Sequence, residues 1–165
     1  MIGHVQSRKA PLVAGHFNFM HSLDSLKLAK KLDRFCTEAD RTLPVLLEFN
    51  VGGEDSKGGW EAVDEAHWEN LLPEVSELLA MPNLQVRGLM SMPPLGTDAE
   101  FARPYFQKLR RLREFLTSQF PQANFSELSM GTSSDYEVAV EEGATFVRIG
   151  TAIVGPRNYQ LAENL

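Results

Sequence analysis

The chain has 165 residues, of which 43% are apolar and 23% are charged, and this balance is that of a folded globular domain. A formal net charge of −6 and a pI near 5.2 argue against a general surface for nucleic acid or anionic membranes, because both need a positive field. The single cysteine, an N-terminus without an apolar signal region, and the lack of any long apolar run predict a cytoplasmic protein with no membrane segment.

Short apolar runs rich in β-branched residues alternate along the chain with longer segments of helical periodicity. The predicted strands are residues 1–5, 17–23, 44–51, 84–92, 125–130 and 146–150. The predicted helices are residues 7–15, 24–39, 66–81, 99–119 and 134–143. This alternation of strand and helix predicts a parallel sheet covered by helices.

Three residue patterns mark helix ends. Asp24 is the expected N-cap of the helix over 24–39. Ser134 and Glu137 have the spacing of a capping box, and Gly143 stands where a C′ glycine closes the same helix.

Six strand–helix units without a linker or a change in composition predict one domain over residues 1–165. An α/β fold of this kind is either an open doubly wound sheet or an eight-unit barrel. Six units fit the open sheet, or a barrel that lacks two units.

Two consecutive predicted strands end in small residues with free amides and hydroxyls, "SMGTSS" at 129–134 and "GTA" at 150–152. A phosphate monoester needs backbone N–H donors and small side chains that let the backbone come close. The loops after the last two strands are also where phosphate sites recur in parallel barrels. These segments therefore predict a phosphate cup, with plain turns and helix caps as the alternative.

Arg148 lies inside the last predicted strand, where an unpaired guanidinium is costly to bury. It must reach the mouth of the sheet and bind a ligand, or else form a structural ion pair, for example with Glu48. Glu48 and Arg87 lie on adjacent predicted strands and are a second possible pair.

Other candidate sites have weaker signals. His16 and His21 are five residues apart, which is not the spacing of a helical metal pair, so we expect no metal site. Residues 108–114 form a basic helix face that is typical of a solvated surface. No pair of residues stands out as catalytic.

The motifs "IGHVQSRK", "HSLDSLKLAKKL", "EDSKG", "RGLMSMPP" and "LSMGTSSDYEVAVEEGATFVRIGTAIVG" occur in the order of one family. Together they resemble the pyridoxal phosphate homeostasis proteins, also called proline synthase co-transcribed homologues. The resemblance implies a parallel (β/α) TIM barrel of the alanine racemase N-terminal type, of which this chain has about six of eight βα units, strands 3 to 8.

The same resemblance implies pyridoxal 5′-phosphate as the cofactor, held at the carboxyl mouth of the barrel. The family's arginine that faces the pyridine nitrogen falls on Arg148, and a protonated arginine there weakens the ring as an electron sink. The family's phosphate-binding residues fall on Ser129, Met130, Gly131, Ser133, Gly150 and Thr151.

In the family, the lysine that binds the cofactor covalently ends the first strand. This sequence begins inside the third, so we expect the first two βα units and that lysine to be absent from the chain, as in a truncated or split gene. Lys9 or Lys57 is a possible substitute amine.

The expected function is a non-catalytic carrier or buffer in pyridoxal phosphate homeostasis. The alternatives are a racemase-like pyridoxal phosphate enzyme, an unrelated phosphate-ligand barrel enzyme and an inactive remnant. Oligomeric state is left open.

Overall fold

The computed structural model describes residues 1–54 and 56–155. Asp55 of the "EDSKG" motif and residues 156–165 of the expected domain lie outside the described residues. Parallel strands form one sheet in the order β1-β2-β4-β5-β6, and the short strand β3 pairs only with β2. The strands are β1 (Met20–Leu23), β2 (Leu43–Asn50), β3 (Trp60–Glu61), β4 (Leu84–Met90), β5 (Glu127–Thr132) and β6 (Phe146–Arg148).

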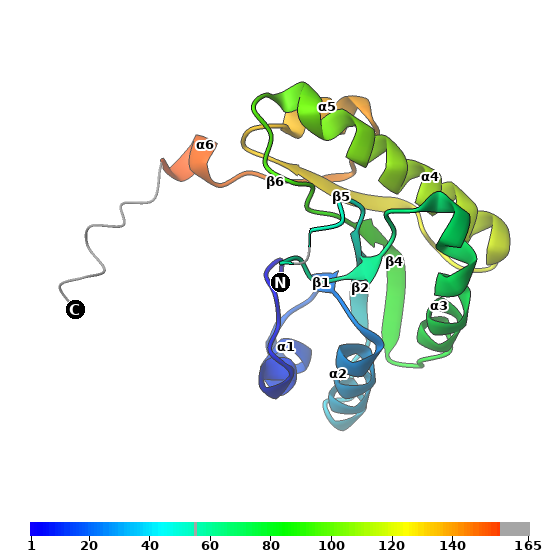
Figure 1. Cartoon of the computed structure of the whole chain (residues 1–165). Helices are drawn as coiled ribbons and strands as arrows, with labels where there is room; N and C mark the ends of the chain where they lie inside the picture. Colours follow the sequence, from blue (N-terminus) through cyan, green and yellow to red (C-terminus); the bar gives the residue numbers. More distant parts are fainter. Residues whose placement is uncertain (55, 156–165) are drawn as a thin grey trace.

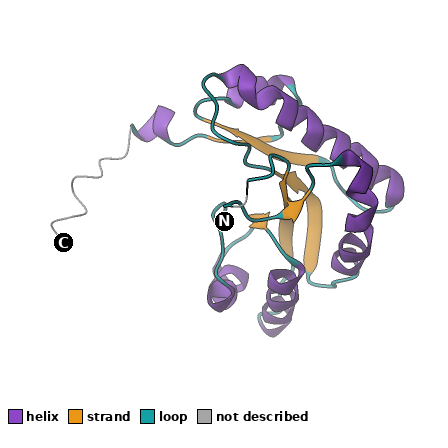
Figure 2. Cartoon of the chain, in the orientation of Figure 1, coloured by secondary structure: helices purple, strands orange, loops and turns teal. Residues whose placement is uncertain are grey.

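Helices follow the strands and lie around the outside of the curved sheet (Figures 1 and 2). The α-helices are α1 (Ala10–His16), α2 (Leu26–Glu38), α3 (Leu72–Leu79), α4 (Arg103–Gln119), α5 (Tyr136–Glu141) and α6 (Thr151–Val154). The 3-10 helices η1 (Ser7–Lys9), η2 (Glu65–Leu71) and η3 (Ala99–Ala102) lead into α1, α3 and α4. This parallel half-barrel with outer helices confirms the predicted fold class.

The main core lies between the outer face of the sheet and the helices. Every second residue of β2 faces this core, with Val45, Leu47 and Phe49 almost fully buried. The facing stripe of α4 repeats at helical spacing and is also fully buried: Phe106, Leu109, Leu112 and Leu116. The two periodicities visible in the sequence thus meet in one core, which leaves the other face of the sheet for the barrel interior.

Aromatic side chains on the interior face join the two ends of the sheet. His21 of β1 packs edge-on against Phe146 of β6 and against Phe19, each at a centroid distance of 4.9 Å. Phe19 and Phe146 are themselves 5.6 Å apart. Because β1 and β6 are the outermost strands in the sheet order, these contacts show that the sheet curls until its edges face each other across the interior.

The strand expected over residues 1–5 is wrong. Met1 pairs with the chain beside β1, through its amino group to the Phe19 carbonyl (2.7 Å) and through its own carbonyl to the His21 amide (2.8 Å). The ladder stops there, because the Gly3 carbonyl accepts from the Ser22 hydroxyl rather than from a backbone amide. A strand that the sequence pattern did not indicate, β3, instead pairs with the end of β2.

Two expected helix caps are also wrong. Ser25, not Asp24, caps α2 by accepting from the Leu28 amide, while Asp24 is bound to His4 and to the Ser25 hydroxyl. The N-cap position of α5 is Asp135, with no capping-box bond between Ser134 and Glu137. The closure of α5 by Gly143 is confirmed, since this residue has φ 93° directly after the C-cap.

Candidate functional site

A pocket of about 600 Å³ opens at the carboxyl ends of β5 and β6. Its walls come from both small-residue segments, from Arg148 and from the loop after β4 through Leu95. The lining residues are Leu95, Thr132, Ser133, Ser134, Arg148, Gly150, Thr151 and Ala152. The pocket therefore lies at the edge of the sheet where parallel α/β folds place their ligands.

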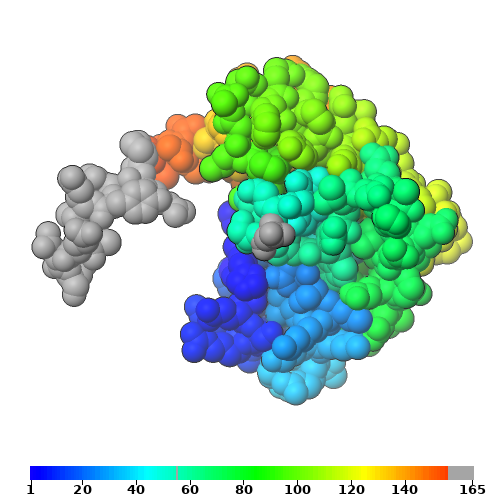
Figure 3. All heavy atoms as spheres, viewed as in Figure 1, coloured from blue at the N-terminus to red at the C-terminus, as the bar shows by residue number. Residues whose placement is uncertain are grey.

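The two small-residue segments meet at Ser133. Its hydroxyl oxygen accepts from the Gly150 amide at 3.1 Å and from the Ala152 amide at 3.2 Å. These amides begin α6, which carries exposed Ile153 and Val154 and stands out from the body of the molecule in Figure 3. Both of these backbone donors are thus occupied by the Ser133 hydroxyl in this structure, and a phosphate would have to take its place to use them; the phosphate cup stays a prediction.

Gly131 gives β5 its shape just below the pocket. Its φ is 92°, and a Cβ atom there would lie 2.5 Å from the Cβ of Ala139 on α5. Only glycine allows this approach of the strand end to the helix. Met130 points the other way into the core and is fully buried, so neither residue contributes a polar side chain to the pocket.

Arg148 is held at two points on neighbouring strand ends. One terminal nitrogen donates to Ser129 Oγ at 2.7 Å, and the other donates to the Ser91 carbonyl at 2.8 Å. Burial lowers the pKa of the guanidinium from its usual value, but an arginine side chain stays charged at neutral pH. Among the described residues no carboxylate lies within 4.0 Å of Arg148, so the structural ion pair considered above is not formed.

His21 completes a chain of polar contacts below the pocket. Its Nδ1 atom lies 2.9 Å from Ser129 Oγ, which joins β1 to β5 across the interior. The pKa of His21 is lowered to about 4, first by burial and then by the positive charges of the N-terminal amino group and Arg148. The imidazole is therefore neutral near pH 7.

Glu48 lies on the interior side of β2. Burial raises the pKa of its carboxyl group, nearby Asp24 adds to the rise, and Arg148, His4 and Lys57 oppose it. Within the described chain neither Glu48 nor Arg87 has an ion-pair partner, so the second possible pair is not formed either.

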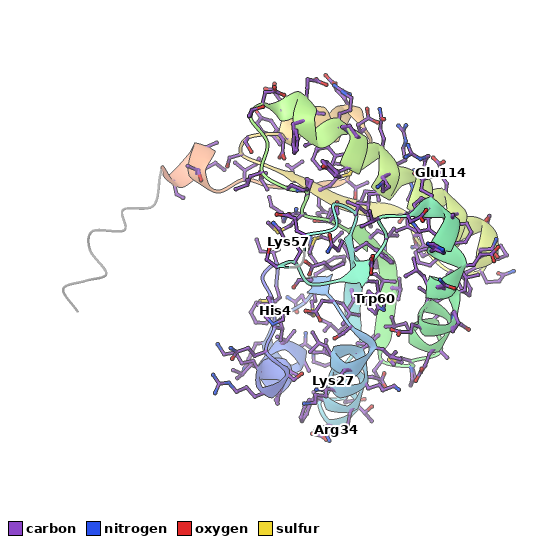
Figure 4. The ribbon with its side chains drawn as sticks, in the orientation of Figure 1. His4, Lys27, Arg34, Lys57, Trp60 and Glu114 are labelled. Carbon is purple, nitrogen blue, oxygen red and sulfur yellow. The ribbon has the colours of Figure 1, made fainter. Side chains whose placement is uncertain are left out.

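The two lysines considered as substitute amines lie outside the pocket lining. Lys57 Nζ is 3.5 Å from Glu54 Oε2, and Figure 4 shows Lys57 on a loop near the N-terminal segment, which carries His4. Lys9 ends the 3-10 helix η1 and is exposed. Neither side chain lines the pocket that contains Arg148.

The sequence interpretation missed two contacts of this site. His21 was weighed only as half of a metal pair, although it occupies an interior-facing position of β1. Ser91 contributes a backbone carbonyl, which leaves no signal in residue type. In the part of the chain that the structure describes, no three metal-ligating side chains gather and no helix is long and apolar enough to cross a membrane.

The sequence pattern of the alanine racemase N-terminal domain matches residues 1–158. Two curated relatives named pyridoxal phosphate homeostasis protein, from Aquifex aeolicus and Vibrio alginolyticus, are each 44% identical over 96% of this chain. The chain spans 66% and 64% of their respective lengths. It belongs to the alanine racemase N-terminal domain family.

Solved structures agree with this assignment. PipY of Synechococcus elongatus is 38% identical and superposes with TM-scores of 0.83 without pyridoxal phosphate and 0.81 with pyridoxal phosphate bound. The match covers 93% of this chain and 68% of PipY. Alanine racemase of Clostridium difficile, at 14% identity and a TM-score of 0.66, shares the fold.

Proposed function

We propose that this chain binds pyridoxal 5′-phosphate in the pocket at the ends of β5 and β6, and that it serves cytoplasmic pyridoxal phosphate homeostasis as a carrier or buffer without turnover. One observation carries the proposal: Arg148 lines this pocket without an ion-pair partner among the described residues, beside the hydroxyls and amides of the two small-residue segments. The relatives' names and the pyridoxal phosphate bound to PipY support it.

The residues present fit this cofactor. Ser133 and Thr151 offer hydroxyl donors suited to a phosphate monoester, and the Gly150 amide joins them if a phosphate oxygen replaces the Ser133 oxygen that it now binds. Pyridoxal phosphate, when bound, supplies an aldehyde for amines and an electron-accepting ring. Arg148 suits the ring nitrogen as a permanent donor, which leaves that nitrogen unprotonated and favours storage of the cofactor over catalysis.

The other family positions act on the site indirectly. Gly131 sets the approach of β5 to α5, and Met130 anchors that strand in the core. Ser129 is fully buried, and its hydroxyl contacts Arg148 and His21. We assign to these three residues the shape of the pocket, and to Ser133, Arg148, Gly150 and Thr151 the contacts with the cofactor.

The proposal is tested by measuring the affinity for pyridoxal phosphate of the Arg148→Met variant. Loss of a charge-assisted hydrogen bond weakens binding by about tenfold or more. The matched control is Arg34→Met, because Arg34 lies on the outer side of α2, far from the strand ends (Figure 4), and its side chain is 63% exposed.

Equal affinity of both variants and the unchanged protein would show that this pocket is not the binding site. The carrier role is tested separately by incubating the loaded protein with L-alanine and following chirality. We expect no racemisation, and multiple turnovers would favour the racemase-like alternative.

A further inference from the structure

We propose that His21 is a positioning residue for Arg148 and acts through the hydroxyl of Ser129. The inference rests on the proposed function, because it assigns to His21 the orientation of the group that faces the cofactor ring. His21 contacts Ser129, and Ser129 contacts Arg148, so three residues from β1, β5 and β6 form one hydrogen-bonded chain, called the relay below.

The direction of each hydrogen bond in the relay follows from the donors available. A guanidinium nitrogen can only donate, so Ser129 Oγ accepts from Arg148. The single hydroxyl proton of Ser129 is then free to be donated to His21 Nδ1 at 2.9 Å. This requires an unprotonated Nδ1, and a neutral imidazole meets the requirement by carrying its proton on Nε2.

The surroundings of His21 favour the same neutral form. The rings of Phe19 and Phe146 pack on it, and the neighbouring charges, Arg148 and the N-terminal amino group, are both positive. A protonated imidazole would face two cations and would compete with Arg148 for the Ser129 oxygen. A neutral imidazole has two tautomers, and the proposed relay is the one with the proton on Nε2; in the other, Nδ1 would be a second donor to the Ser129 oxygen.

The relay matters because it fixes the position of one terminal nitrogen of the Arg148 guanidinium. The other arm is fixed by the Ser91 carbonyl, so the plane of the guanidinium is defined by two neighbouring strands. Without the acceptor on His21, the Ser129 hydroxyl loses its orientation and can turn its proton toward another partner. Arg148 is then held less firmly at one of its two anchors, although it remains charged.

The relay is tested first on the ligand-free protein by NMR. Nitrogen–proton correlation of the His21 ring should show Nε2 protonated and Nδ1 unprotonated at pH 7. Slowly exchanging guanidinium protons of Arg148 should be visible in the unchanged protein and in His21→Asn, whose side-chain oxygen can replace Nδ1 as acceptor. They should be lost in His21→Leu and Ser129→Ala. A proton on Nδ1, or Arg148 signals that persist in both of the latter variants, would overturn the proposal without any ligand.

Binding then separates positioning from packing. Relative to the unchanged protein, His21→Leu should bind pyridoxal phosphate about tenfold more weakly, and His21→Asn should recover most of that loss. Inorganic phosphate, which uses only the cup, should compete equally well in all variants that fold. An equal loss for both ligands would mean that His21 only supports the fold. If the unchanged protein fails to bind pyridoxal phosphate, the proposed function falls while the NMR result still decides the relay.

Discussion

At the scale of single residues, the site is defined by hydrogen bonds between the charged guanidinium of Arg148 and neutral oxygen acceptors. Arg148 forms no ion pair with a described carboxylate, although the charges of Glu48 and Asp135 act on it from farther away, and the Ser129 hydroxyl and the Ser91 carbonyl hold it with neutral oxygens. A buried cation of this kind is costly unless something else pairs with it. The arrangement is therefore more easily explained as a binding group than as a stabilising one.

The lowered pKa of His21 makes stability depend on pH. The folded state holds this imidazole neutral down to about pH 4, whereas the unfolded chain binds the proton near pH 6.5. The unfolded state thus binds more protons between these values, and the protein should lose stability as the pH falls from about 6.5 toward 4. We expect the difference in melting temperature between the unchanged protein and His21→Asn to shrink across this window. If the difference in melting temperature between the two proteins stays constant from pH 6.5 to pH 4, the lowered pKa of His21 is contradicted.

At the scale of elements, the pocket depends on how closely β5 and α5 approach. Gly131 and Gly143 have nearly the same positive φ, 92° and 93°. Only Gly131 meets another residue at the position of a Cβ atom, since the space around Gly143 is open. Substitutions at these two glycines can therefore be compared: at Gly143 a side chain costs only backbone strain, and at Gly131 it costs backbone strain and a steric overlap.

Replacing Gly131 by Ala should lower the free energy of unfolding by about 2–4 kcal/mol, because a strained backbone and a steric overlap with Ala139 add together. Gly143→Ala should cost only about 1–2 kcal/mol, from the backbone alone. Urea unfolding measures both. Equal losses would show that α5 shifts freely, and cofactor affinity should then be unchanged in Gly131→Ala as well.

The same scale shows what the sequence could predict. The strand β2 and the helices α2 and α4 follow from periodic burial, a local property visible in residue order, whereas β5 and β6 show no such alternation and were indicated by their apolar runs. The choice between Asp24 and Ser25 as a cap was missed, since both side chains suit an N-cap and the bond of Asp24 to His4 decides between them. The contact of His21 with Ser129 could not be predicted from local sequence, because the two residues are 108 positions apart in the chain.

At the scale of the whole molecule, the half-barrel has a pocket at the ends of β5 and β6 with no lysine in its lining. The pocket is built from the C-terminal strands and from the loop after β4, all within the described residues. Cofactor binding by this chain should accordingly be reversible and led by the phosphate group.

Borohydride reduction of the loaded protein, followed by intact mass measurement, should therefore leave the mass of the unmodified chain. Lys57→Arg and the control Lys27→Arg on α2 (Figure 4) identify the amine if an adduct forms. A stoichiometric adduct that disappears only in Lys57→Arg would show that the loop lysine reaches the ring, and that binding is covalent after all.

The contact between His21 and Ser129 also has a consequence for folding kinetics. It closes a loop of 108 residues, and long loops lose the most chain entropy before their contacts form. Every strand of the main sheet except β6 lies within or at the ends of that loop, and Arg148 of β6 joins the same oxygen. The binding group is thus oriented only when the sheet is complete, so that a partly folded chain, even one with most of its helices formed, cannot hold the ligand.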